Sequence, residues 1–242
     1  MRVLLLGGTA EARALADRLH PGVEIISSLA GRVPDPALPV GPVRIGGFGG
    51  VAGLRTWLGG NGITAVVDAT HPFAATITAN AARACRESGI AHLVLHRPPW
   101  NADGATAVDS DIEAAKTVAA KGYSRVFLTI GRSGVRAFRD GDAWFLIRVV
   151  TAPDAQTLPR NHQVVLSRGP YGYDGEHALL SGNGIEALVT KNSGGAMTRA
   201  KLDAARDLGV DVVMIQRPPL PPGVSVVESV DDALGWVRAQ PG

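Results

Sequence analysis

Glycine, hydroxyl and carboxylate groups follow the first apolar run of the chain. The segment Gly7-Gly8-Thr9-Ala10-Glu11 comes directly after Val3–Leu6. Glycines after a strand let the backbone approach a pyrophosphate, and the start of the next helix attracts its negative charge. The later glycines of a full dinucleotide fingerprint are missing, so a plain strand-to-helix turn is the alternative. We assign these residues to a dinucleotide site: Gly7, Gly8, Thr9, Ala10 and Glu11.

A second group of polar residues, Ser27–Arg32, follows a predicted strand over residues 24–26. NAD enzymes place Asp or Glu at this point to hold the ribose 2′-hydroxyl. Ser28, Gly31 and Arg32 suit a 2′-phosphate better, because a guanidinium pairs well with phosphate. This favours NADPH over NADH as the cofactor. A solvated loop arginine is the alternative interpretation of Arg32.

A third segment, Asp68-Ala69-Thr70-His71-Pro72-Phe73-Ala74, ends a buried run. Asp68 and Thr70 are assigned to the cofactor site. A histidine beside a cofactor can bind a carboxylate or relay a proton, so His71 is the candidate proton donor and, with Pro72 and Phe73, a substrate contact. Alternatively, Thr70 or His71 only caps the following helix, which is predicted to continue through Cys85.

Cations follow the matching runs of the second half. Thr129–Gly134 keeps its glycines and gains Arg132, and Thr190–Gly195 offers a lysine, an amide and two glycines at a predicted helix start. Such groups form an anion cradle, and arginine forks match carboxylates. Arg97 and Arg217 each open an Arg-Pro-Pro sequence and alternatively cap strand-end carbonyls. Residues assigned to an anionic substrate are Arg97, Gly131, Arg132, Ser133, Tyr171, Lys191, Asn192, Ser193, Gly194 and Arg217.

An internal repeat organises these segments. Residues 84–99 align without a gap with residues 204–219, each containing a helix end, a glycine, a buried strand and Arg-Pro-Pro. Strands alternating with helices predict crossover connections and parallel sheets covered on both faces. We therefore predict an α/β fold of two Rossmann-like, doubly wound domains related by duplication, with a cleft between them. Residues 1–121 should bind NADPH and residues 122–242 should contribute the substrate site. The strand and helix after each Arg-Pro-Pro can pack on either sheet, so strand exchange stays open.

Composition excludes several classes of protein. A net charge of +2 over 242 residues is too small for a bulk nucleic-acid binder. The single cysteine excludes an intramolecular disulfide framework and fits a cytoplasmic location. No apolar run reaches the length of a signal peptide or membrane span, and the six histidines lack zinc-site spacing. We expect no membrane, metal or nucleic acid partner.

As a set, these motifs resemble the precorrin-6A reductase family over nearly the whole chain. The matching residues are those at 7–11, 28–32, 68–74, 190–195 and 217–218. The resemblance implies reduction of one double bond of precorrin-6A to give precorrin-6B, by hydride transfer from NADPH, on the way to cobalamin. It also implies a tetrapyrrole substrate with many carboxylates, which fits a chain of 20 arginines and 4 lysines. The family includes reductases of cobalt-containing precorrin-6A. The Arg- and Ala-rich composition favours the metal-free substrate.

Two other functions remain open at this point. One is a different NADP-dependent reductase with a small substrate, and the other is a nucleotide-sensing binding protein without chemistry. A binding protein needs one nucleotide site and has no need of a second, cationic set of strand ends. The sequence leaves open whether the chain is a monomer or a homodimer.

Overall fold

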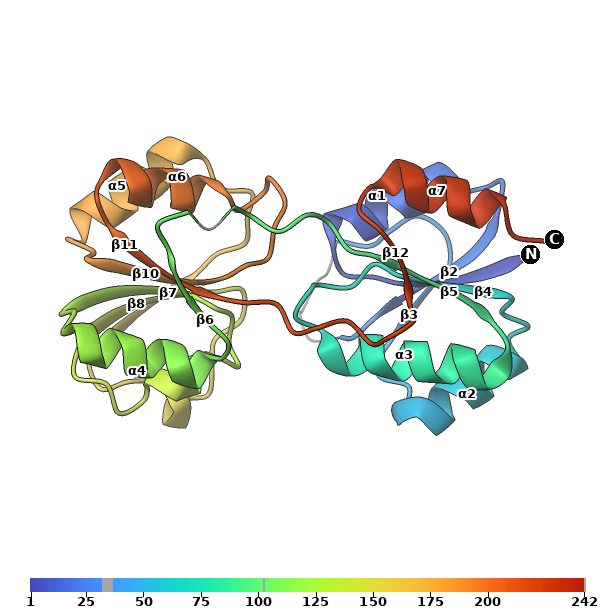
Figure 1. The fold of residues 1–242 in the computed structure, drawn as a ribbon, viewed down its shortest axis with the longest axis horizontal. Coiled ribbons are helices and arrows are strands. Elements are labelled where there is room, and N and C mark those ends of the chain that lie inside the picture. The colour runs from blue at the N-terminus through green and yellow to red at the C-terminus, as the bar shows by residue number, and fades with distance from the viewer. Residues whose placement is uncertain (32–36, 102, 242) are drawn as a thin grey trace. The chain divides into compact units, whose positions relative to one another are not determined.

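The computed structural model describes residues 1–31, 37–101 and 103–241. It contains two six-stranded sheets in which every neighbouring pair of strands is parallel (Figure 1). This confirms the predicted α/β class with two doubly wound sheets. The first sheet consists, in spatial order, of β3 (Val43–Ile45), β2 (Glu24–Leu29), β1 (Arg2–Leu6), β4 (Ala65–Asp68), β5 (Ala91–Leu95) and β12 (Ser225–Val227).

Helices cover both faces of the first sheet. α1 (Ala10–Leu19) and α7 (Val230–Arg238) lie on one face, and α2 (Gly50–Gly60) and α3 (Ala75–Ser88) on the other (Figure 1). Side chains alternate along β1, so Val3 and Leu5 pack in the first layer while Leu4 and Leu6 pack in the second. A strand buried on both faces is a continuous apolar run, as the sequence shows.

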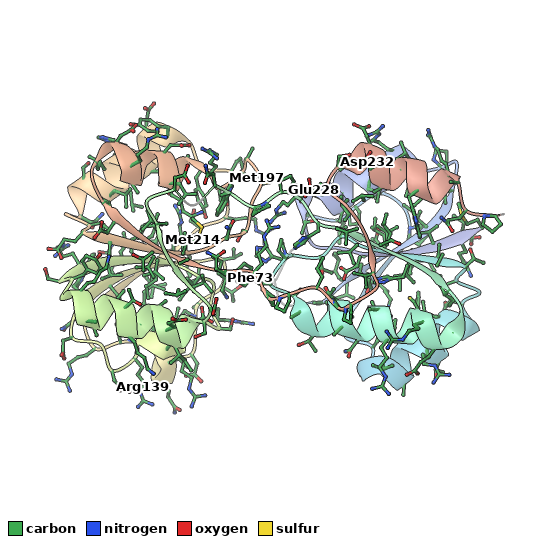
Figure 2. All side chains as sticks on the ribbon, viewed as in Figure 1. Phe73, Arg139, Met197, Met214, Glu228 and Asp232 are labelled. Atoms are coloured by element: carbon green, nitrogen blue, oxygen red, sulfur yellow. The ribbon has the colours of Figure 1, made fainter. Side chains whose placement is uncertain are left out.

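The second sheet repeats this order. It consists of β9 (His162–Leu166), β8 (Trp144–Val149), β7 (Arg125–Thr129), β10 (Ala187–Lys191), β11 (Asp211–Ile215) and β6 (Thr106–Val108). α5 (Tyr173–Gly182) and α6 (Ala200–Asp207) cover one face and α4 (Asp111–Lys121) the other, with short 3₁₀ helices at Val135–Phe138 (η1) and Ala155–Thr157 (η2). Met214, on β11, is buried in the second unit, whereas Arg139 is exposed and points outward (Figure 2).

The two halves exchange their last strand and helix. β6 and α4 follow the first half in sequence but β6 pairs with β11, and β12 likewise pairs with β5. The exchanged strands make equivalent bonds, from His96 N to Val227 O and from Gln216 N to Val108 O, both at 2.8 Å. The compact units are therefore Met1–Pro98 with Pro218–Gly242, the first unit, and Pro99–Arg217, the second unit.

This exchange corrects the boundary predicted at residues 121–122. The equivalent strand orders of the two sheets agree with the repeat, but the end of a repeat in sequence is not the end of a compact unit. Two consecutive prolines follow each of β5 and β11. Proline pairs hold the backbone extended and cannot donate hydrogen bonds, so the chain leaves the sheet edge instead of turning back.

The shared strand order indicates where ligands are expected to bind. In each unit the connections reverse direction between the first strand and its neighbour, which are β1 and β4 in one unit and β7 and β10 in the other. Open α/β sheets bind ligands outside the carboxyl ends of the strands at such a point. None of the helices in the described residues is long and apolar enough to span a bilayer.

Candidate functional site

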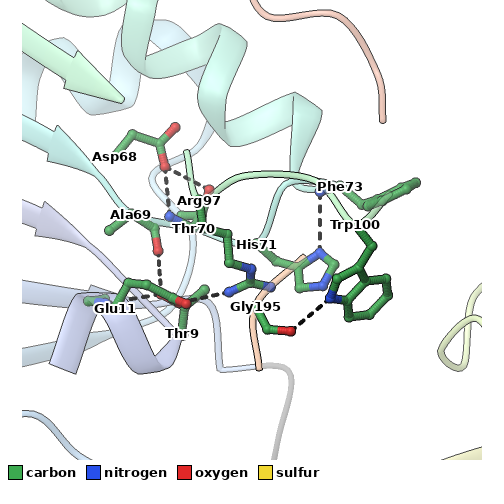
Figure 3. A network of polar contacts seen from close by, with 11 residues as sticks. Thr9, Glu11, Asp68, Ala69, Thr70, His71, Phe73, Arg97, Trp100 and Gly195 are labelled. Atoms are coloured by element: carbon green, nitrogen blue, oxygen red, sulfur yellow. Dashed lines mark hydrogen bonds and ion pairs between the residues drawn. The ribbon is translucent and has the colours of Figure 1, made fainter. Parts of the chain in front are cut away.

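The ends of β1 and β4 are joined through Thr9. Its hydroxyl donates to Ala69 O at 2.7 Å and accepts from Ala12 N at 3.1 Å, so it also caps α1 (Figure 3). Gly8 precedes it with φ 110°, a conformation that L side chains rarely adopt, and no heavy atom lies within 4 Å of the position of a Cβ. The glycine turn, Gly7–Glu11, thus presents open backbone at the start of a helix.

The second strand is longer than predicted. β2 continues to Leu29, so Ser27 and Ser28 lie within it and not in the following loop. The parallel pairing with β1 and β3 satisfies their backbone groups, which local serine propensity does not reveal. Ser28 O accepts from Gly7 N at 2.9 Å. Gly31 has φ 70° and ends the described part of this segment. Arg32 lies outside the described residues.

The Asp68 segment forms a compact turn at the end of β4. One oxygen of Asp68, Oδ1, accepts from Thr70 N at 3.0 Å and from Thr70 Oγ1 at 2.6 Å. His71 Nδ1 accepts from Phe73 N at 3.2 Å (Figure 3). Neither Thr70 nor His71 caps α3, which begins at Ala75 without a side-chain cap. The capping alternative is therefore wrong, because these side chains bond within the turn.

A salt bridge joins two residues that the sequence placed in different sites. Arg97 Nη1 lies 2.7 Å from Glu11 Oε2, and the two side chains are 15% and 25% exposed. Glu11 stands in the first turn of α1, where a carboxylate is favoured by the helix dipole. A carboxylate beside a pyrophosphate would repel it, so Arg97 neutralises Glu11 at this point (Figure 3).

The corresponding glycine turn of the second unit has a different form. Gly131 has φ 78°, and Gly134 N bonds to Gly131 O at 3.2 Å. The turn leads into the 3₁₀ helix η1 and not into an α-helix, so the strand–glycine–helix unit is not repeated here. Arg132 and Ser133 are exposed at this strand end. Without an α-helix, the second turn lacks the helix N-terminus that favours a pyrophosphate.

The Lys191–Gly194 segment is a loop. We expected it at a helix start, but α6 begins only at Ala200. Gly194 and Gly195 have φ 66° and 78°, and two left-handed residues in succession cannot belong to a right-handed helix. Lys191 ends β10, and its Nζ lies 3.8 Å from Asp111 Oδ1 at the start of the exchanged helix α4.

Trp100 forms hydrogen bonds to Asn192 and Gly195 of the loop that follows β10. Its backbone N donates to Asn192 Oδ1 at 2.8 Å, Asn192 Nδ2 donates to Trp100 O at 3.2 Å, and the indole Nε1 donates to Gly195 O at 2.8 Å. Arg217 Nε donates to Asn192 O at 2.8 Å. Asn192, predicted to bind substrate, is buried and uses its amide to hold Trp100. Sequence reasoning missed Trp100, although it differs from Leu220 at the same place in the repeat.

Charged groups are also buried beneath the second unit's loops. Arg148 and Glu176 form a two-bond ion pair, with Nη2 to Oε2 at 3.0 Å, and Tyr171 lies over the guanidinium at 3.7 Å. Lys201 Nζ donates to Thr198 O at 2.6 Å. Burial, together with the positive charge of Arg148, lowers the pKa of Lys201 to about 7, while Glu176 opposes the shift. Tyr171, predicted as a substrate contact, therefore packs on an ion pair.

The predicted site residues that the structure describes thus lie at the carboxyl ends of strands in the two sheets. Those of the first unit end or follow β1, β2, β4 and β5, and those of the second end or follow β7, β9, β10 and β11. Among the residues that the structure describes, no cluster of His, Cys, Asp and Glu could hold a metal.

Comparison with known proteins decides the family. The model described as "Precorrin-6x reductase CbiJ/CobK" matches residues 2–238. The chain belongs to this reductase family. The precorrin-6A reductase of Mycobacterium tuberculosis (strain ATCC 25618 / H37Rv) is 69% identical over 240 residues, covering 99% of this chain and 98% of that protein. A solved structure, "CobK precorrin-6A reductase", superposes with a TM-score of 0.91 at 39% identity, covering 98% of this chain and 96% of that one.

The more distant relatives carry a different name. The cobalt-precorrin-6A reductase of Priestia megaterium is 30% identical over 251 residues, covering 96% of this chain and 97% of that protein. The family resemblance drawn from the motifs is confirmed. Membership makes the chain an oxidoreductase of cobalamin biosynthesis that uses a nicotinamide cofactor.

Proposed function

We propose that the chain reduces precorrin-6A to precorrin-6B, with NADPH as the hydride donor. The observation that carries the choice of substrate is the 69% identity to a protein named precorrin-6A reductase, against 30% to one named for the cobalt form. A cytoplasmic location stays a prediction from the single cysteine.

The first unit offers the groups that a dinucleotide needs. Gly8 leaves open space beside the backbone, and the capped start of α1 favours the pyrophosphate. Bound there, the nicotinamide supplies the hydride. The residues proposed for this site are Gly7, Gly8, Thr9, Ala10, Glu11, Ser28, Gly31, Arg32, Asp68 and Thr70.

The cations at the strand ends would bind the carboxylates of the macrocycle. Arg97 and Lys191 are each oriented by an acidic neighbour, Glu11 and Asp111. A guanidinium or an ammonium carries several N–H donors and can therefore pair with more than one carboxylate. The residues proposed for the substrate site are His71, Pro72, Phe73, Arg97, Gly131, Arg132, Ser133, Tyr171, Lys191, Asn192, Ser193, Gly194 and Arg217. Asn192 and Tyr171 would act by holding the loop and the buried ion pair described above.

His71 is the proposed proton donor. Because Nδ1 accepts from Phe73 N, the neutral ring carries its proton on Nε2. The Nε2–H group can donate a hydrogen bond to a substrate carboxylate. To give up a proton after hydride transfer, the ring must first take a proton on Nδ1, which replaces the bond from Phe73 N, and the imidazolium then returns to the neutral ring. Solvent is the alternative proton source, and a pair of substitutions at His71, given in the Discussion, separates the two.

The proposed reaction has a direct spectroscopic test. Purified protein is mixed with precorrin-6A and either NADPH or NADH, and the visible band of the macrocycle is followed together with nicotinamide absorbance. We expect both bands to change with NADPH, and much more slowly with NADH. A parallel assay with cobalt-precorrin-6A is expected to be slower. No change with either nucleotide would refute the reductase assignment, and faster reduction of the cobalt form would refute the choice of substrate.

A further inference from the structure

Arg44 lies on β3, beside the carboxyl end of β2. It is the register partner of Ser28, and its Nη1 donates to Ser28 Oγ at 2.8 Å. The carbonyl oxygen of Ser28 accepts from Gly7 N at 2.9 Å. Arg44 is therefore connected, through a single residue, to the glycine turn in which the pyrophosphate of NADPH is proposed to bind.

Neutral groups hold the guanidinium in place. Nη1 also donates to Gly46 O at 2.9 Å, and Nη2 donates to Gly47 O at 3.0 Å. The central carbon of the guanidinium lies 3.8 Å from the ring centre of Phe48 and 5.5 Å from that of Trp57. A side chain fixed by so many contacts has little conformational entropy left to lose when it binds a ligand.

The charge of Arg44 has no acidic partner in the part of the chain that the structure describes, where the ion pairs involve other residues. Partial burial lowers the pKa of Arg44 from its ordinary value. A partly desolvated cation surrounded by hydroxyl, carbonyl and aromatic groups is a favourable position for an anion, because the anion restores the charge balance.

The geometry of the remaining donors indicates what kind of anion. The bonds to described residues use Nη1 and one N–H of Nη2. They leave Nε–H and the second N–H of Nη2, which project from the guanidinium as a fork. Such a fork matches two oxygens of a phosphate group. In doubly wound sheets the adenosine ribose of a dinucleotide is read at the end of the second strand, where Ser28 lies.

We infer that Arg44 recognises the 2′-phosphate of NADPH. This inference rests on the proposed function and makes Arg44 a residue that determines cofactor specificity. The sequence interpretation gave this role to Arg32, which follows Ser28 closely. Arg44 reaches the same strand end from the neighbouring strand β3, and its guanidinium donates to the carbonyl oxygens of Gly46 and Gly47.

The test compares nucleotide binding, without the macrocycle, in matched variants. The dissociation constants of NADPH and NADH are measured by nicotinamide fluorescence for the unsubstituted protein, Arg44→Ala, Arg44→Lys and Arg32→Ala. Arg55→Ala is the control, because Arg55 is an exposed arginine of the same unit that pairs with Glu87 on α3. Competition by 2′,5′-ADP and by 5′-AMP isolates the phosphate. Circular dichroism checks that each variant is folded.

We expect Arg44→Ala to weaken NADPH and 2′,5′-ADP binding by about 10- to 100-fold, the usual effect of losing a charged hydrogen bond. NADH and 5′-AMP should change by less than about twofold, since they lack the phosphate. Arg44→Lys should fall between, because an ammonium keeps the charge but loses the fork. If Arg44→Ala does not fold, the comparison is made with Arg44→Lys alone. Arg55→Ala should resemble the unsubstituted protein.

Each opposite result has a definite meaning. If the unsubstituted protein prefers NADPH and both Arg44 variants keep that preference, the inference is overturned while the proposed function stands. An equal loss of NADPH and NADH binding in Arg44→Ala would mean that Arg44 only supports the Gly46–Gly50 segment, and would also overturn it. If the unsubstituted protein binds both nucleotides equally, the choice of NADPH fails together with the role of Arg44.

Discussion

The hydroxyl of Thr9 donates to the carbonyl oxygen of Ala69 at 2.7 Å, and this bond joins the carboxyl ends of β1 and β4. The same oxygen accepts from Ala12 N and so begins α1. One buried side chain thus fixes both sides of the point where a dinucleotide is expected to bind.

Thr9→Val should destabilise the protein because it removes both hydrogen bonds while keeping the shape. Ala69 O and Ala12 N would each lose a partner in a buried place, which costs about 1–3 kcal/mol of unfolding free energy. Urea unfolding measures the loss. Thr9→Ser keeps the hydroxyl and is the control. Equal stability of the two variants would show that the hydroxyl does not join the strands.

Glu11 and Arg97 should be energetically coupled in NADPH binding. Arg97→Gln leaves the Glu11 carboxylate uncompensated at the start of α1, so we expect weaker NADPH binding. Adding Glu11→Gln should recover about 3- to 10-fold of the lost affinity, because the repulsion disappears. Fluorescence titration of the two single variants and the double variant completes the cycle. Additive effects would show that Arg97 does not act through Glu11.

Lys201 should make stability depend on pH. Its pKa is lowered to about 7 in the folded state from an ordinary value of 10.5. Above pH 7 the unfolded chain therefore holds more protons than the folded one, so stability rises with pH toward 10.5, by at most about 1.4 kcal/mol per pH unit. Well below pH 7 both states are protonated and the contribution is constant.

Lys201→Met tests this without the charge. Urea midpoints at pH 6, 7, 8 and 9 should rise less steeply above pH 7 in the variant than in the unsubstituted protein. The slopes of the two curves should become equal toward pH 6, where Lys201 is protonated in both states. Parallel curves over the whole range would show that Lys201 stays protonated beside Arg148 and Glu176.

Trp100→Phe should loosen the loop that carries the proposed substrate residues. It removes the indole bond to Gly195 O but keeps the backbone bonds to Asn192. Losing one bond of about 1 kcal/mol should speed amide exchange in residues 193–199 about fivefold. The KM for precorrin-6A should rise while the dissociation constant of NADPH is unchanged. Trp236→Phe in α7 is the control, and equal exchange in both variants would contradict the role of Trp100.

The two possible roles of His71, proton donor and carboxylate ligand, can be separated by the substitutions His71→Asn and His71→Gln. Asn at this position places an acceptor where Nδ1 accepts from Phe73 N but loses Nε2, whereas Gln reaches the Nε2 position. If His71 donates the proton, both variants should lower kcat about 100-fold or more. If it only binds a carboxylate, His71→Gln should keep most of kcat and His71→Asn should raise KM. The pH profile of kcat separates the two cases.

Local patterns predicted much of this fold. Buried runs such as Val3–Leu6 and Ala65–Asp68 are strands, and the helices predicted after each Arg-Pro-Pro are present, capped by Ser110 and Ser229. These features depend on residues close together in the chain. Because the sequence is duplicated, the same local signals occur in both halves. The helix start predicted at Lys191 was wrong, because a short glycine-containing segment fits either a helix start or a loop.

By itself, the sequence determined the duplication, the parallel sheets and the strand ends at which the site residues lie, because periodicity, glycine stops and Arg-Pro-Pro are local signals. Only the tertiary structure decided which sheet receives β6 and β12, since an edge strand carries no local mark of the partner it pairs with. It also decided that Arg97 meets Glu11 and that Arg44 meets Ser28. Long charged side chains reach across neighbouring strands, and their partners depend on the register of the folded sheet rather than on distance along the chain.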